Sequence, residues 1–339
     1  MRGSSPSAWL TEPSFAEMMS DPVFQQLMAS DRIATECFNG LVSSVRQRLR
    51  PQPRYSGDHA PRFVAAGVFS SRGAFVVGQI LVDGSICKKD GICVAACPAG
   101  TLALDADGYP EEVGAICYHC GHCAAICPSQ ALTHTGLPAG GMLPVAKDQP
   151  SAEVVDSLLM SRRSIREFRD QPIERATFEA ILDVARRAPT ASNDQTLHWI
   201  MLNGRERVHD LASECVLRMK EVQPTTPLFQ RVIAAWDKGL DGTLRGATAV
   251  AVVCTPQEAA CGPSDAAIAL THAELAAAAR GLGMTWAGIL MYVAAASEPL
   301  RRWLQVPEGY SVSAAAMFGY GKYKYHRIPP RKPLNARWI

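Results

Sequence analysis

The chain has 339 residues and a mass of 36.6 kDa, which suits one very large domain or two to three ordinary ones. With 47% hydrophobic and 19% charged residues, the composition is typical of a soluble globular protein. A formal net charge of +2 gives no indication of a nucleic-acid or membrane partner. The amino terminus does not resemble a signal peptide, and the most apolar early segment, 63–82, is interrupted by serine, arginine and glycine. It falls short of the roughly 18 apolar residues of a membrane span, so we expect a cytoplasmic protein.

Residues 1–78 are expected to form an amino-terminal extension of helical and irregular structure, to which no function is assigned. Phe24, Leu27 and Met28 have the spacing of one helical face, and residues 62–82 contain strand-like apolar runs. The basic run from Arg46 to Arg54 is interpreted as a solvated linker, with docking of an acidic redox partner as the alternative.

Seven of the eleven cysteines lie in two runs of matching spacing between Cys87 and Pro128. The second run, which begins at Cys117, is a complete C-x2-C-x2-C-x3-C-P sequence. The first run, from Cys87 to Pro98, has the same frame but carries Asp90 in its second ligand position. Thiolates at this spacing suit the corners of a cubane iron–sulfur cluster. Clustered cysteines also indicate a reducing compartment rather than a disulfide framework.

Residues 79–136 repeat one pattern twice, consisting of a strand, a cysteine loop, a short helix and a second strand. Ile80 begins the first strand, and Asp107-Gly108 is expected at a hairpin turn. The segment resembles a bacterial two-cluster ferredoxin domain, in which the fourth cysteine of each run serves the other cluster. The resemblance implies one 4Fe–4S cluster on Cys117, Cys120, Cys123 and Cys97, and another on Cys87, Cys93, Cys127 and Asp90. A linker rich in glycine and proline, residues 137–150, is expected to follow.

Asp90 leaves three alternatives open for its site, because a carboxylate is a harder iron ligand than a thiolate. The site holds an aspartate-ligated 4Fe–4S cluster, a 3Fe–4S cluster, or a cluster with one iron open to solvent. We favour the first, with Asp90 as a labile ligand, and expect the two clusters to differ in potential. A zinc site is a weaker alternative for seven cysteines with two Cys-Pro endings. His119 and His122 occupy spacer positions and are expected to face solvent.

Residues 151–339 contain a series of expected helices and strands. One helix is expected to begin near Val154 and to end in the segment 161–168. Others are expected over 173–187, 206–221 and 264–280, the last of them apolar on nearly every side and therefore buried. Strands are expected over 198–203, 247–254, 288–293 and 313–318.

Four motifs in this part of the chain carry a second resemblance. They are Arg162-Arg-Ser-Ile-Arg-Glu-Phe168, Ala188-Pro-Thr-Ala-Ser-Asn-Asp-Gln195, Gly281-Leu-Gly-Met-Thr-Trp-Ala-Gly288, and Gly319-Tyr-Gly with Pro330-Arg-Lys-Pro333. Their order over residues 155–335 resembles the nitroreductase family of FMN enzymes. The fold class is therefore expected to be α+β, a ferredoxin-like two-cluster domain followed by an FMN-dependent nitroreductase fold.

The resemblance also implies how FMN is held. Its phosphate dianion suits arginine forks and a hydroxyl donor, supplied by Arg162, Ser164 and Arg331 with Arg163 and Lys332 nearby. The pyrimidine edge of the flavin would be contacted by Arg166, Asn193 and Gln195, and a backbone amide near Gly288 would face N5. No catalytic side chain is named, because the family leaves the chemistry to the flavin. Family members are homodimers whose FMN sites use both subunits, so a homodimer is expected.

Together the two resemblances predict an iron–sulfur flavoprotein oxidoreductase. Electrons would pass from the clusters to FMN and on to a small organic acceptor, such as a nitroaromatic, a quinone or an activated alkene. NAD(P)H or a redox protein would be the donor, although no Rossmann motif is visible. One alternative is an electron-transfer module for a partner enzyme. Another is an FMN-dependent dehydrogenase that discharges through the clusters.

Overall fold

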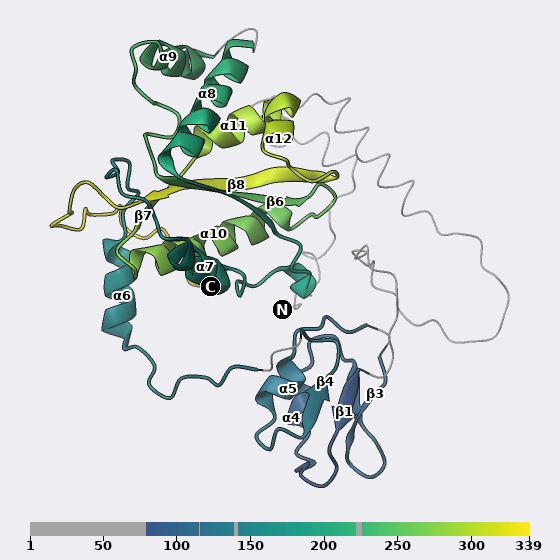
Figure 1. Cartoon of the computed structure of the whole chain (residues 1–339). Helices are drawn as coiled ribbons and strands as arrows, with labels where there is room; N and C mark the ends of the chain where they lie inside the picture. The colour runs from purple at the N-terminus through teal and green to yellow at the C-terminus, as the bar shows by residue number, and fades with distance from the viewer. Residues whose placement is uncertain (1–78, 115, 139–141, 222–225) are drawn as a thin grey trace, which may run out of the picture. The chain divides into compact units, whose positions relative to one another are not determined.

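The computed structural model describes residues 79–114, 116–138, 142–221 and 226–339 (Figure 1). The helices and strand-like runs expected within residues 1–78 lie outside this part of the chain. Among the described residues, no helix combines the length and apolar character that crossing a membrane requires.

The cysteine-rich segment folds into short elements around two small antiparallel sheets. In chain order these are β1 (Ile80–Val82), α4 (Ile92–Ala95), β2 (Leu102–Leu104), β3 (Pro110–Glu112), α5 (His122–Ile126) and β4 (Leu132–His134). Strand β1 pairs with β4, and β2 pairs with β3. The expected turn lies between β2 and β3, where the Asp105 carboxylate accepts hydrogen bonds from the backbone N–H groups of Asp107 and Tyr109 at 2.9 and 2.8 Å. The predicted pattern of strand, loop, helix and strand is confirmed in both halves.

The internal repeat extends to the backbone conformation. Lys89 and Gly91 have positive φ angles of 54° and 70°, and the residues thirty positions later, His119 and Gly121, have φ angles of 50° and 72°. Each glycine directly precedes a short helix, α4 or α5. A left-handed residue costs little at glycine, which has no Cβ. Equivalent positions in the two cysteine loops can therefore be compared residue by residue.

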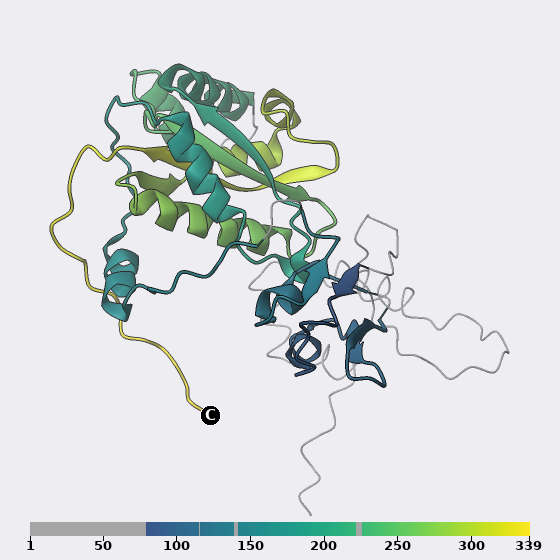
Figure 2. The same ribbon diagram turned by 60° about the horizontal axis from the view of Figure 1, so that its bottom comes forward.

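The larger part of the chain is an antiparallel four-stranded sheet with helices on both faces. Its elements are α6 (Ala152–Ser161), α7 (Arg175–Ala185), the 3-10 turn η1 (Ala191–Asn193), β5 (His198–Asn203), α8 (Arg205–Glu221), α9 (Pro227–Trp236), β6 (Ala249–Pro256), α10 (Gly262–Ala278), β7 (Gly283–Trp286), α11 (Gly288–Ala296), α12 (Glu298–Trp303) and β8 (Tyr310–Gly319). The strand order is β5-β6-β8-β7. Figure 1 shows α7 and α10 on one side of this sheet and α8, α11 and α12 on the other, and the view in Figure 2 shows the same division.

Side chains of β6 alternate between two cores, as the pleat of a strand requires. Val250 and Val252 belong to the core shared with α8, α11 and α12, whereas Ala251 and Val253 belong to the core shared with α7 and α10. All four are at most 1% exposed, because the central strand is covered on both faces. This explains why residues 249–254 form a continuous apolar run instead of alternating with polar residues.

One of the predicted strands is wrong. Residues 288–293 form the first part of helix α11, and the strand at this edge of the sheet is β7, directly before it. Leu290, Val293 and Ala294 are buried at i, i+3 and i+4, which is the spacing of a helical face. A short apolar run bounded by glycine fits a buried strand and a buried helix equally well, so periodicity could not separate them. The other predicted helices and strands of this part of the chain are found within a few residues of their expected bounds.

The segment that follows α6 extends the sheet beyond β7. Ile165 N–H donates to the Met284 carbonyl at 3.0 Å, and Arg169 N–H donates to the Tyr320 carbonyl at 2.8 Å. Glycine permits this close approach, since a Cβ on Gly283 would overlap the Ile165 side chain. The structure therefore holds the first expected FMN motif against β7 and the end of β8.

Replacing Gly283 with alanine is expected to lower the free energy of unfolding by about 1–3 kcal/mol, the usual cost of overpacking a close contact. Gly242 provides the control, because a Cβ there would meet its nearest neighbour, Val232 Cγ1, at an ordinary 3.7 Å. Chemical denaturation of the two variants measures the difference. Equal stability of Gly283→Ala and Gly242→Ala would show that the motif is not pressed against β7.

Candidate functional site

The cysteines and Asp90 line two separate hollows. Cys97 lies with Cys117, Cys120 and Cys123 around a hollow of ≈ 360 Å³. Cys127 lies with Cys87, Asp90 and Cys93 around a second hollow of ≈ 280 Å³. The last cysteine of each run therefore joins the first three positions of the other run. The structure brings together the same two sets that the sequence assigned, and their soft thiolate donors fit iron–sulfur clusters.

The last cysteines of the two runs are in the same environment. Burial raises the pKa of the Cys97 thiol, but hydrogen bonds from Thr101 and neighbouring backbone outweigh it and hold the pKa below its ordinary value. For Cys127, burial is likewise outweighed by hydrogen bonds from Ser129 and Ala131, so its pKa is also lowered. Stabilised thiolates suit metal binding, because a cysteine must lose its proton to become a ligand.

The cysteines at the third ligand position of each run, Cys93 and Cys123, are buried instead. Burial raises the pKa of Cys93 and of Cys123, and both thiols pack in the small core with Leu102 and Leu132. Each hollow therefore has one buried thiol, which comes from the short helix α4 or α5.

Asp90 is exposed at the rim of the smaller hollow. Its Oδ1 accepts a hydrogen bond from Ile92 N–H at 3.3 Å, which keeps the carboxylate in the loop between Cys87 and Cys93. That Asp90 ligates iron stays a prediction.

Two histidines, His122 and His134, line the larger hollow, and a third, His119, lies in the chain between two residues that line it. His119 and His122 are exposed, as expected for spacer residues. His134, which was not singled out from the sequence, is buried, and its Nε2 lies 3.4 Å from Cys117 Sγ. Burial lowers the pKa of His134 below its ordinary value, and the neighbouring His119 lowers it further. The neutral imidazole is therefore favoured at neutral pH.

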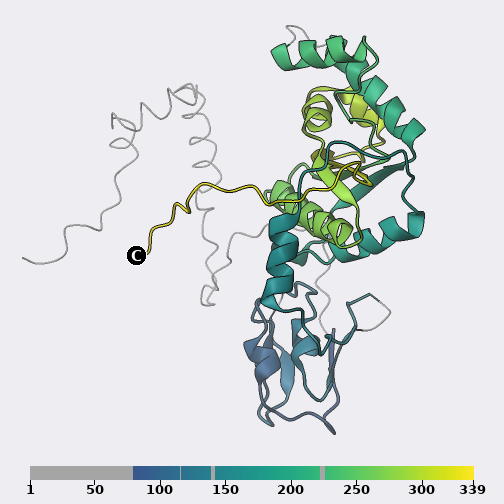
Figure 3. The same ribbon diagram turned by 90° about the vertical axis from the view of Figure 1, so that its left-hand side faces the viewer.

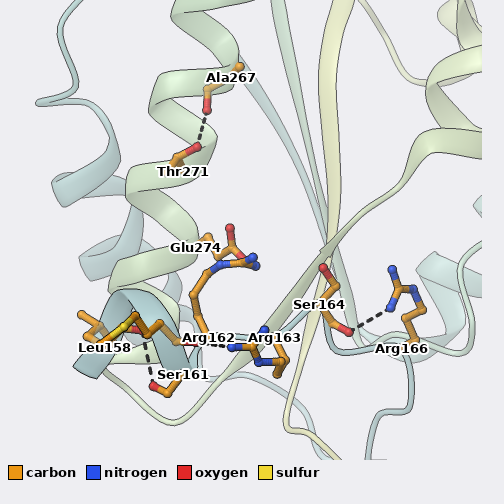
Figure 4. Close-up of polar contacts among 10 residues, drawn as sticks. Leu158, Ser161, Arg162, Arg163, Ser164, Arg166, Ala267, Thr271 and Glu274 are labelled. Atoms are coloured by element: carbon orange, nitrogen blue, oxygen red, sulfur yellow. Dashed lines mark hydrogen bonds and ion pairs between the residues drawn. The ribbon is translucent and has the colours of Figure 1, made fainter. Parts of the chain in front are cut away.

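The first expected FMN motif begins with an ion pair that spans 112 residues of sequence. Arg162 Nη1 lies 2.6 Å from Glu274 Oε1 on helix α10, and the two side chains are 29% and 12% exposed. Figure 4 shows the Arg162 side chain turned toward Glu274. Sequence reasoning missed Glu274, because nothing in its local pattern distinguishes it from other polar residues of the helix.

The neighbouring residues of the motif point in different directions. Arg163 donates from Nη2 to the Met160 carbonyl, while its Nε is buried with no hydrogen-bond partner among the described residues. Arg166 is exposed, and its Nη1 donates to the Ser164 carbonyl at 3.3 Å (Figure 4). An arginine nitrogen that is buried and unpaired indicates a place where an acceptor is expected.

The second expected motif forms a loop with a strained backbone. Ser192, Asn193 and Gln195 have positive φ angles of 51°, 55° and 51°. The carboxylate of the buried Asp265 holds the loop by accepting from Ala191 N–H at 3.2 Å with both oxygens. Left-handed conformations at several non-glycine residues cluster at functional sites. Asp265 is a second supporting residue that the sequence analysis missed.

The last two expected FMN contacts lie on different kinds of structure. Gly288 is the first residue of α11, so its N–H precedes the hydrogen-bond ladder of the helix. Arg331 lies in the exposed segment that follows β8 and runs away from the sheet without regular structure (Figure 3). Among the residues that the structure describes, no hydrogen bond or ion pair joins the Arg331 side chain to another residue. That Arg331 contacts FMN stays a prediction.

Two families match this chain. Residues 159–320 match the nitroreductase family, and residues 79–128 match the 4Fe–4S dicluster domain. The chain therefore combines a nitroreductase family domain with a 4Fe–4S dicluster domain. The nitroreductase domain makes the protein an oxidoreductase.

Individual proteins resemble parts of the chain. A protein of Archaeoglobus fulgidus, provisionally named NADH dehydrogenase/NAD(P)H nitroreductase, is 28% identical over 170 residues, which are 49% of this chain and 84% of that protein. The 4-nitrobenzoate reductase of Nocardioides sp. is 38% identical over 58 residues, which are 17% of this chain and only 24% of that enzyme. A nitroreductase of Bacteroides fragilis, solved with bound FMN, aligns over 56% of this chain and 98% of its own, with a TM-score of 0.47 and 19% identity.

Proposed function

We propose that the protein is an iron–sulfur flavoenzyme in which clusters on residues 79–136 supply electrons to FMN on residues 151–339. The observation that carries the proposal is the sorting of seven thiols and Asp90 into two donor sets on a chain that also has a nitroreductase domain. FMN exchanges two electrons with an organic substrate and single electrons with clusters. The acceptor would be a small nitroaromatic, quinone or activated alkene.

The residues available for FMN suit its charge. Arg162, Arg163 and Ser164 lie on consecutive positions beside β7, and the buried Nε of Arg163 is a donor without an acceptor among the described residues. A phosphate dianion is the kind of group that satisfies such a donor. In this proposal Arg166, Asn193 and Gln195 contact the pyrimidine edge and Gly288 N–H faces N5, while Arg331 reaches the phosphate from the chain's own tail or from a second subunit.

We propose that the protein holds two clusters, which differ in their ligands. Cys97, Cys117, Cys120 and Cys123 supply four thiolates for a 4Fe–4S cluster. The other set has three thiolates and Asp90, so the exposed carboxylate acts as a labile fourth ligand or leaves a 3Fe–4S cluster.

A homodimer is proposed as the working form, with a small molecule as substrate and NAD(P)H or a redox protein as donor. Large apolar side chains are exposed on α6, among them Val154, Leu159 and Met160, and along the final segment, among them Leu334 and Trp338. Apolar surface that is contiguous and exposed commonly marks an interface. Light scattering of the purified protein would measure its mass.

Anaerobic reconstitution followed by rapid mixing tests the proposal. The full chain is loaded with iron, sulfide and FMN, and its iron, sulfide and flavin contents are measured. It is then mixed with NADH, NADPH or a reduced ferredoxin in turn, and flavin and cluster absorbance are followed together. A ferredoxin-type donor is expected to reduce the clusters before the flavin, and a nitroaromatic or quinone then reoxidises both.

Two results would contradict this order of electron flow. Flavin that stays oxidised beside fully reduced clusters would show that the two cofactors do not communicate. Flavin reduced by an organic substrate, with the clusters reduced afterwards, would show that the enzyme works as a dehydrogenase instead.

A further inference from the structure

One buried side chain distinguishes the two halves of the ferredoxin-like repeat. His134 ends β4 and is 6% exposed, whereas Leu104 ends β2 at the equivalent position thirty residues earlier and is 44% exposed. No motif of the sequence draws attention to His134, because it lies outside both cysteine runs.

The hydrogen bonds of His134 fix the tautomer of its ring. Gly136 N–H donates to Nδ1 at 3.1 Å, so Nδ1 carries no proton. A neutral imidazole then has its proton on Nε2, which lies 3.4 Å from Cys117 Sγ. His134 therefore donates Nε2–H to the sulfur of Cys117.

The backbone hydrogen bonds to the last cysteine of each run match. Thr101 N–H donates to Cys97 Sγ and Ala131 N–H donates to Cys127 Sγ, both at 3.3 Å. Of the side chains, only His134 adds an N–H donor to a thiol around the larger hollow, within the described residues. The smaller hollow has the Ser129 hydroxyl at 3.6 Å from Cys127 Sγ.

We propose that His134 is a positioning residue that raises the reduction potential of the cluster on Cys97, Cys117, Cys120 and Cys123. The inference rests on the proposed function, since it needs a cluster in that site. Reduction adds one electron to the cluster, and the imidazole keeps its Nε2–H throughout. The hydrogen bond to sulfur is stronger when the cluster carries the extra negative charge, so it stabilises the reduced state more than the oxidised state.

Two substitutions of His134 separate the effect of its Nε2–H donor from the effect of its hydrogen bond with Gly136. His134→Asn retains an oxygen that accepts from Gly136 N–H but has no donor at the position of Nε2. His134→Gln returns an amide N–H toward the sulfur. His326→Asn is the matched control, because His326 is an exposed histidine in the segment that follows β8 and lines neither hollow.

The measurement is a potentiometric titration of the reconstituted full-length protein, followed by EPR. Asp90→Cys identifies the signal of the cluster on Cys87, Cys93 and Cys127, because it changes only that ligand set. His134→Asn is expected to lower the midpoint potential of the other cluster, and His134→Gln to recover part of the shift. His326→Asn is expected to leave both midpoints unchanged.

The proposal is overturned if His134→Asn moves neither midpoint, or moves both equally, or if His134→Gln remains as low as His134→Asn. Should both variants fail to assemble the cluster, pulsed EPR on the reduced wild type with ¹⁵N-labelled histidine decides. A weakly coupled imidazole nitrogen is expected there, and its absence overturns the proposal. Wild-type protein that forms no iron–sulfur signal at all would contradict the proposed function rather than the role of His134.

Discussion

Replacing Cys97 with alanine is expected to disrupt the cluster whose other ligands are in the second cysteine run, and not the cluster of its own run. The reason is geometric, because Cys97 lines the larger hollow with Cys117, Cys120 and Cys123. About half of the bound iron should be lost, or one cluster should become a three-iron form. Electron transfer to FMN through the clusters should fall by roughly 100-fold, at the upper end of the effects seen when metal sites lose their supporting groups.

Two further variants make this prediction specific. Cys127→Ala should produce the reciprocal loss, since Cys127 lines the smaller hollow with Cys87 and Cys93. Cys254→Ala is the control, because Cys254 is a buried thiol on β6 in the sheet core, far from any cysteine run in sequence, and burial raises its pKa to about 11. Iron and sulfide analysis with EPR measures all three. If Cys97→Ala instead loses the EPR signal of the cluster assigned to Cys87 and Cys93, the last cysteine of each run does not serve the other cluster.

The crossing of the two runs was implied by the resemblance to two-cluster ferredoxins, and that resemblance could be recognised because cysteine spacing is a local signal with a strong chemical requirement. The same spacing put Asp90 in the second ligand position of the first run, and the structure places this residue at the rim of the smaller hollow. His134 was missed, although alignment of the two halves at an interval of thirty residues would have set it beside Leu104. The repeat was recognised for its cysteines and not for the strands that follow them.

The residues that hold the expected FMN motifs in place could not be predicted from local sequence patterns. Asp265 and Glu274 lie on α10, a helix recognised from its alanine-rich sequence as buried, and their partners Ala191 and Arg162 are far away in the chain. Contacts of this kind depend on which helix covers which face of the sheet. A single sequence gives periodicity within an element but not the packing of one element against another.

The one wrong secondary-structure prediction has the same cause, because it too depends on how elements pack. Residues 288–293 are apolar throughout, and only their position after the turn that follows β7 makes them a helix. The edge strand itself, Gly283–Trp286, is short and begins with glycine, so its strand propensity is weak. Its pairing with β8 overrides that weak preference.

Removing the Arg162 side chain is expected to weaken FMN binding by about 10- to 100-fold, the loss of one or two charge-assisted hydrogen bonds to phosphate. The guanidinium has five N–H donors, and Glu274 Oε1 contacts only Nη1, which leaves others for the phosphate. Arg162→Ala also leaves the Glu274 carboxylate, which is 12% exposed, without its cation. The free energy of unfolding of the apoprotein should therefore fall by about 1–3 kcal/mol.

A double variant separates these two effects. Arg162→Ala combined with Glu274→Gln removes the uncompensated charge, so stability should recover while FMN binding stays weak. Arg175→Ala is the matched control, because its ion pair with Glu179 is exposed at 89% and 60% and should contribute less than about 1 kcal/mol. Flavin fluorescence titration measures affinity, and urea denaturation of the apoprotein measures stability. Recovery of both quantities in the double variant would show that Arg162 serves the fold alone, and the phosphate would then have to be held by Arg163 and Ser164 without it.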